Sequence, residues 1–184
     1  MGLFKNRKFA LLVTIIVVIA ATLISVNKSL VRLSREAEAM FYDGVYLESG
    51  GYRQPGLAAQ LDKHAEASLG LATILINYPM LHDNAQVVIE WRRSMVESES
   101  ISGKSNAYRM LSGYVYSLLK AASDIDITDR DQAAIDSYSA TIVGAEEFIR
   151  ASEYNRAASE RWDERSNITR LIGRVLSAAP PEMF

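Results

Sequence analysis

The stretch "FALLVTIIVVIAATLISV", residues 9–26, decides the fold of this chain, because its eighteen residues carry no charge. As an α-helix it would be roughly 27 Å long, close to the thickness of a bilayer's hydrocarbon core. It has no polar face, which argues against the core helix of a water-soluble domain. A cleaved signal peptide would have a shorter apolar region, about 7–15 residues, followed by small residues. We therefore expect residues 1–28 to be an uncleaved transmembrane anchor that contacts lipid through residues 9–26.

The charges are divided unevenly about this anchor. Residues 1–28 contain four basic residues and no acid, so the rest of the chain carries −2 − 4 = −6. An acidic remainder argues against nucleic acid as a partner, because phosphate binding needs a basic face. The basic residues before the anchor favour a cytoplasmic N-terminus, and those after it nearly balance them. We expect the bundle outside the cytoplasm. The two basic sets are Lys5, Arg7 and Lys8, and Lys28, Arg32 and Arg35.

The remainder, residues 29–184, shows apolar residues at the three- and four-residue spacing of amphipathic helices and no strand alternation. We predict an all-α fold in which the transmembrane helix continues into an elongated antiparallel up-and-down four-helix bundle. The first helix is expected to end near residues 48–56, "ESGGYRQPG". The second helix is expected to end near Tyr78, because Pro79 follows it. The third is expected to run from about Asn84 to Ala122 with a kink at Gly103. The fourth is expected to start at the N-cap Thr128.

Turns at the ends of this bundle are candidate protein-contact surfaces. Residues 76–84, "INYPMLHDN", are interpreted as a tight antiparallel connection, with a binding loop around His82 and Asp83 as the alternative. A contact role predicts exposed apolar side chains in the turns. The candidate residues are Tyr52, Arg53, Pro55, Tyr78, Pro79, Met80 and Leu81.

Residue types that carry catalysis or bind metals are sparse. There are no cysteines, and the two histidines, His64 and His82, lie in different segments. Glu66 is two residues from His64 and on another side of a helix, so we expect no metal site there. Four aspartates between residues 124 and 131 lack EF-hand spacing and are interpreted as capping residues, with a cation as the alternative. We predict no cofactor and no enzymatic activity.

Residues 153–167, "EYNRAASERWDERSN", are rich in charge and are interpreted as one solvated helix face rather than an active site. Arg156 and Glu160 are one turn apart and would form a weak surface pair. Tyr154 and Trp162 are expected in the core. The amide of Asn155 is expected to bridge two helices.

Several of these features together resemble the LemA family of bacterial membrane proteins. The resemblance rests on the single N-terminal membrane helix, Tyr78-Pro79-Met80-Leu81, Tyr154-Asn155 and the closing Pro181-Glu182-Met183-Phe184. The chain departs from the family where Trp162-Asp163 stands in place of a second Tyr-Asn, and where the family's Phe-Pro is missing near Asn167. It resembles a divergent, shorter relative. The resemblance implies a helical bundle at the bacterial cell membrane and transfers no catalytic residue.

The expected function is that of a single-pass, membrane-anchored scaffold or adaptor of the bacterial cell envelope, acting through an unidentified membrane or envelope protein. The alternative is a ligand- or envelope-sensing bundle that relays a helix offset through its anchor to a partner. Homo-oligomerisation is left open.

Overall fold

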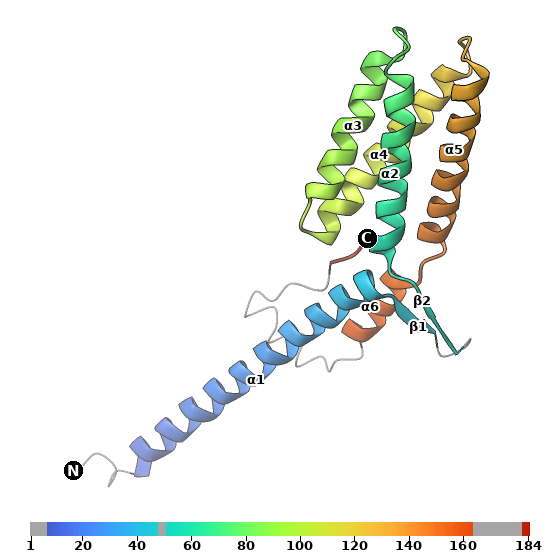
Figure 1. Ribbon diagram of the computed structural model, residues 1–184. Helices are drawn as coiled ribbons and strands as arrows, with labels where there is room; N and C mark the ends of the chain where they lie inside the picture. Colours follow the sequence, from blue (N-terminus) through green and yellow to red (C-terminus); the bar gives the residue numbers. More distant parts are fainter. Residues whose placement is uncertain (1–6, 48–50, 164–181) are drawn as a thin grey trace. The chain divides into compact units, whose positions relative to one another are not determined.

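The structure, a computed structural model, describes residues 7–47, 51–163 and 182–184 (Figure 1). Within these residues it contains six helices and one two-stranded sheet, so the predicted all-α class is confirmed. The motif residue Pro181 and the basic residue Lys5 lie outside the described residues. The elements are α1 (Arg7–Asp43), β1 (Val45–Leu47), β2 (Tyr52–Gln54), α2 (Leu57–Leu75), α3 (His82–Glu97), α4 (Ile101–Ala122), α5 (Asp129–Arg150) and α6 (Tyr154–Asp163).

The chain divides into two compact units, each of which is described by itself. The first unit comprises residues 1–37 and 158–181, and the second comprises residues 38–157 and 182–184. The first unit therefore contains the predicted anchor, residues 1–28, and the second contains α2, α3, α4 and α5.

The helix α1 runs without a break for 37 residues, as the absence of helix breakers predicts. Its apolar half is long enough to span a membrane, with a mean hydropathy of 2.9 over an 18-residue window of which none is buried. Most of the large apolar side chains from Leu11 to Ile24 are 49% to 63% exposed, and Val13 and Leu23 are half-buried. Water would solvate such a surface poorly.

The first helix ends earlier than the sequence predicts. The helix was expected to end near residues 48–56, but α1 stops at Asp43 and β1 follows. Gly44 has a φ of +95°, and a Cβ there would come within 1.9 Å of the Gln54 carbonyl oxygen. Its N–H donates to the Met40 oxygen at 3.0 Å, which caps the helix. β1 and β2 then pair antiparallel, with Tyr46 opposite Arg53, so the expectation of no strand is wrong here.

The helices α2, α3, α4 and α5 alternate in direction, and α4 crosses behind α2 at an angle in the view of Figure 1. Close contacts are most numerous between α2 and α5, between α3 and α4 and between α2 and α3. Each helix buries one apolar stripe, which is why the sequence shows helical spacing. The largest fully buried members of this core include Leu57, Leu61, Leu71, Leu75, Leu111 and Leu118.

The predicted third helix, Asn84 to Ala122, is in fact two antiparallel helices. The chain leaves α3 after Glu97, and α4 begins at Ile101. Ser100 supplies the N-cap, because its side-chain oxygen accepts from the Gly103 N–H at 3.0 Å. In place of the predicted kink at Gly103, the chain therefore reverses its direction between Glu97 and Ile101. The bundle is consequently built from α2 to α5, without the first predicted helix as one of its four members.

The connections before and after α5 are close to the predicted ones. Thr128 is the N-cap of α5, and its side-chain oxygen accepts from the Asp131 N–H at 3.3 Å. Helix α5 ends at Arg150 and α6 begins at Tyr154, so the chain leaves helical geometry at the start of the charge-rich stretch. The Gln54 side chain holds the connection between the two helices, since it donates to the Ala151 oxygen at 3.4 Å and accepts from the Glu153 N–H at 3.1 Å.

Candidate functional site

Three of the predicted contact residues lie on or beside the β1–β2 hairpin, and all three are exposed. Tyr52 and Arg53 belong to β2, and Pro55 follows it. Tyr46, on β1, was not predicted but is 63% exposed and faces Arg53 across the sheet. The hairpin therefore presents Tyr46, Tyr52 and Arg53 to solvent, and we call these three residues the hairpin surface.

The other four predicted contact residues lie at the opposite end of α2, between α2 and α3. Met80 is 81% exposed and Pro79 is exposed, whereas Leu81 is only 2% exposed and belongs to the core. The Tyr78 hydroxyl donates to the Asp131 carboxylate at 2.7 Å, which holds this turn against the start of α5. Leu81 is thus a core residue of the bundle, and the Tyr78 hydroxyl already has a partner within the bundle.

The alternative of a binding loop around His82 receives no support from its hydrogen bonds. His82 Nδ1 donates to the Ile76 oxygen at 3.0 Å, and the Gln86 side-chain amide donates to Nε2 at 3.0 Å. Both ring nitrogens are therefore engaged locally. This arrangement agrees with a tight connection between α2 and α3.

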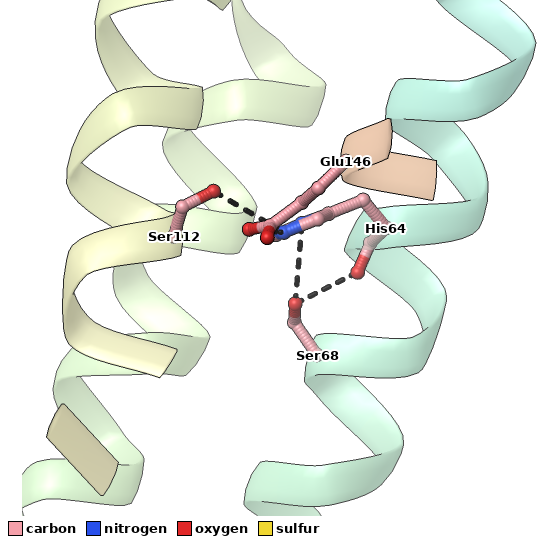
Figure 2. A network of polar contacts seen from close by, with 4 residues as sticks. All are labelled: His64, Ser68, Ser112 and Glu146. Carbon is pink, nitrogen blue, oxygen red and sulfur yellow. Dashed lines mark hydrogen bonds and ion pairs between the residues drawn. The ribbon is translucent and has the colours of Figure 1, made fainter. Parts of the chain in front are cut away.

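His64 is a fully buried polar residue of the bundle, and its side chain has no exposed surface. Figure 2 shows it with Ser68 from the next turn of α2, Ser112 from α4 and Glu146 from α5. Ser68 Oγ donates to the His64 main-chain oxygen at 2.7 Å and lies 3.3 Å from Nδ1. Nε2 lies 3.2 Å from Ser112 Oγ and 3.3 Å from a Glu146 carboxylate oxygen. We call these four residues the His64 network.

Burial governs the protonation of this network. Removal from water lowers the pKa of His64, and the hydrogen bond and charge of Glu146 oppose that shift. A proton on Nε2 of the neutral ring is donated to the Glu146 carboxylate, whereas a proton on Nδ1 is donated to Ser68 Oγ and leaves Nε2 to accept from Ser112. The Tyr108 ring packs edge-on against His64 at 5.2 Å between centroids, and burial raises the pKa of its phenol.

The His64 network does not have the geometry of a nucleophilic triad. In a triad the acid and the nucleophile contact opposite nitrogens of the imidazole. Here Ser112 and Glu146 both face Nε2, and the serine at Nδ1 already donates to a main-chain oxygen. The network instead joins α2, α4 and α5 by hydrogen bonds, and each of its buried polar atoms has a partner.

A second set of polar contacts joins Tyr154 and Asn155 to the segment Glu182–Phe184. The Asn155 side chain donates to the Phe184 main-chain oxygen at 2.6 Å and accepts from the Phe184 N–H at 2.8 Å. The Tyr154 hydroxyl donates to the Glu182 main-chain oxygen at 2.7 Å. We predicted that Asn155 bridges two helices, and it instead binds the main chain of a segment that follows α6. We call the residues that receive Glu182–Phe184 the segment site.

Aromatic side chains complete the segment site. Phe41, which is fully buried, lies 5.5 Å from the Tyr154 ring and 6.0 Å from the Phe184 ring between centroids. Tyr154 is also buried, as predicted, and the side chain of Trp162 lies outside the described residues. Burial, with the charges of Glu182 and Glu38, raises the pKa of Tyr154 to about 12. The phenol therefore stays protonated and keeps its donor at neutral pH.

Sequence reasoning missed the His64 network, although a signal for it was present. His64 and Ser68 are one helical turn apart and fall on the same buried stripe as Leu57, Leu61 and Leu71. Two polar residues on an otherwise apolar stripe predict buried partners on facing helices. Their identity as Ser112 and Glu146 depends on how α4 and α5 pack, which one sequence does not reveal.

Among the described residues, no group of three or more His, Asp or Glu side chains is placed to hold a metal ion. A small apolar pocket of about 130 Å³ opens between the end of α1, α2, α3 and α4, and Lys104 and Asp62 stand at its rim. The Lys104 ammonium donates to the last carbonyl oxygens of α3, at 3.4 and 3.5 Å. The lysine therefore serves as a cap of that helix.

No protein-family model, no curated protein and no solved structure matches this chain.

Proposed function

We propose that this protein is a single-pass, membrane-anchored helical-bundle protein that acts as a scaffold or adaptor through contacts with other proteins. The observation that carries the proposal is the exposed apolar half of α1, followed in the same helix by the start of the bundle unit. An uncharged helix with apolar side chains on all sides is typical of a membrane span. The resemblance to the LemA family supports a place in the bacterial cell envelope, with the bundle outside the cytoplasm.

The hairpin surface is the contact surface that we propose for a partner protein. Tyrosine and arginine are enriched in protein interfaces, because they combine a large contact area with hydrogen-bonding groups. Tyr46 and Tyr52 are both more than half exposed in a sheet of two strands, whose outer edges also carry main-chain groups outside the pairing. The solubility of the bundle does not require two exposed tyrosines and an arginine on so short a hairpin.

Site-specific crosslinking in native membranes tests this proposal. A benzoylphenylalanine at position 46 or 52 should give a defined crosslinked protein that mass spectrometry identifies. The matched control is the same probe at Tyr116, which is 73% exposed on α4, away from the hairpin. The substitution Arg53→Glu should abolish the crosslink from position 46. Equal crosslinking from positions 46 and 116, or a pattern that Arg53→Glu does not change, would contradict a contact at the hairpin surface.

A sensing bundle that relays a helix offset to a partner is the second candidate, and the continuity of α1 favours it. A helix of 37 residues without a break transmits a displacement along its axis. Insertion of two glycines after Asn27 would interrupt the relay without removing the span. A sensor would lose its response after this insertion, whereas a scaffold would keep its crosslinks from position 46.

A further inference from the structure

We propose that the segment site is an exchange site, which also receives the Glu182–Phe184 segment of a second copy of this chain. The inference deepens the proposed function, on which it rests for the confinement of both copies to one membrane. The segment that the site receives is one in which a glutamate precedes an aromatic residue by two positions.

The segment site recognises main-chain groups, as a peptide-binding site does. The Asn155 amide makes both hydrogen bonds that a neighbouring strand would make to Phe184, at 2.6 and 2.8 Å. The Tyr154 hydroxyl adds a third, to the Glu182 oxygen at 2.7 Å. Hydrogen bonds to the main chain give affinity that does not depend on sequence, and side-chain contacts then give specificity.

Two side chains of the segment are recognised specifically. The Glu182 carboxylate accepts from the Ser102 N–H at 3.0 Å, in the first turn of α4, where the helix dipole favours a negative charge. The Phe184 ring lies 5.6 Å from the Tyr108 ring and 6.0 Å from the Phe41 ring between centroids. Met183 between them is exposed. The requirement is therefore Glu-x-Phe.

The segment is held loosely enough to exchange. Glu182 and Met183 are exposed, and Phe184 is only half-buried. The contacts involve three residues, which are far fewer than those that fix a helix of the bundle. A second copy supplies the same three residues with the same chemistry, and two copies anchored in one bilayer meet at a raised local concentration.

The first arm of the test measures binding of a peptide to the full-length chain in detergent. The probe is a fluorescent Pro-Pro-Glu-Met-Phe peptide, amidated at its end. We expect it to bind the Phe184→Ala chain about tenfold more tightly than the wild-type chain, whose own segment competes. Adding Asn155→Ala should weaken binding about tenfold, because two hydrogen bonds are lost. Asn84→Ala, an exposed asparagine near the start of α3, is the matched control and should leave binding unchanged.

Peptide variants check the specificity. Replacing the peptide's Glu by Gln or its Phe by Ala should weaken binding, and replacing its Met by Ala should not. Should Phe184→Ala fail to fold, a photoreactive benzoylphenylalanine at the peptide's Phe position reports on the wild-type chain, where it should label Phe41 or Tyr108. Absence of binding and labelling overturns the proposal and leaves the segment as an internal brace.

The second arm asks whether a second copy is the source. The chain has no cysteine, so Met183→Cys in one copy and Ser102→Cys in another provide a unique pair of thiols. We expect a disulfide-linked dimer when the two chains are mixed, and none when Tyr116→Cys replaces Ser102→Cys. Peptide binding without this dimer overturns the second copy as partner. Loss of the hairpin crosslinks with retention of the dimer contradicts the proposed adaptor function alone.

Discussion

The apolar half of α1 and the helix α2 show two different uses of apolar residues. In α1 the apolar side chains surround the helix and are exposed, and none of the most apolar window is buried. In α2 the apolar side chains follow one stripe and are buried, and the same stripe contains His64 and Ser68. A helix that is apolar on all sides matches a lipid solvent, whereas a striped helix matches protein on one side and water on the other. In the function that we propose, the first region is the membrane anchor and the second belongs to the scaffold.

A charge placed in α1 should have the largest effect. Val17→Arg puts a cation near the centre of the predicted span, which costs about 2.5–3.5 kcal/mol for membrane insertion. We expect the fraction of the protein that resists carbonate extraction from membranes to fall steeply. The matched control is Val143→Arg, at a residue that is 52% exposed on α5. Equal extraction of the two variants would show that α1 is not in lipid.

A cavity in the core of α2 should have the next largest effect, on the stability of the bundle. Leu71 has no exposed surface, and Leu71→Ala should lower the free energy of unfolding by about 2–5 kcal/mol. Membrane association should not change. Val143→Ala should change the free energy by less than about 0.5 kcal/mol. Chemical denaturation in detergent measures both, and a Leu71→Ala chain as stable as the wild type would contradict the assigned core.

Acid should weaken the bundle through His64. Because burial lowers the pKa of His64 below its ordinary value of 6.5, the unfolded chain binds the proton more readily than the folded chain. The stability contributed by the neutral ring is present above pH 6.5 and is lost as the pH falls below that value. Glu146, Tyr108 and Ser112 are the polar groups that face this ring from α4 and α5.

His64→Gln should flatten this pH dependence. Between pH 6.5 and about pH 5, above the range in which most carboxylates titrate, the wild-type free energy of unfolding should fall and that of the variant should not. His82→Gln is the matched control, since His82 is exposed, and it should retain the wild-type slope. A slope that follows His82 and not His64 would contradict the assignment.

The smallest expected effect concerns Tyr154. Tyr154→Phe removes one hydrogen bond to the Glu182 oxygen and should lower the free energy of unfolding by about 1 kcal/mol. The pKa of Tyr154 is raised to about 12, so the folded chain keeps its proton where the unfolded chain loses it. The stabilisation is therefore complete below pH 10 and is lost between pH 10 and 12. Subtracting the variant's pH profile from the wild-type profile should reveal this loss, and Tyr116→Phe should show none.

The helical elements could be predicted from the sequence wherever a strong local signal exists. The uncharged run predicted the long apolar first helix, Thr128 with Asp129 and Asp131 predicted the start of α5, and Pro79 predicted the turn after α2. Each of these signals acts within one or two helical turns. Their physical cause is local, so one sequence suffices.

The elements that were missed depend on contacts between distant residues. Gly44 reads as part of an apolar stripe, but its conformation is set by the close approach of Gln54, ten residues away. The reversal at Ser98–Ser100 requires α3 and α4 to pack together, and the single N-cap hydrogen bond of Ser100 is a weak signal. Ser112 and Glu146, which contact His64, lie 48 and 82 residues away from it in the sequence. Phe184, which binds Asn155, lies 29 residues away from it.

Thiol accessibility along α1 tests the central claim most directly, because the chain contains no cysteine of its own. Single substitutions Val17→Cys and Ile19→Cys place thiols at apolar positions that are exposed on α1, and Tyr116→Cys places one on the bundle. The reagent is a water-soluble, membrane-impermeant maleimide, and the samples are membranes opened so that both faces meet water. The account predicts that the α1 thiols stay unreactive until detergent is added, while the thiol at position 116 reacts at once. Rapid labelling at positions 17 and 19 in the membrane sample would contradict it.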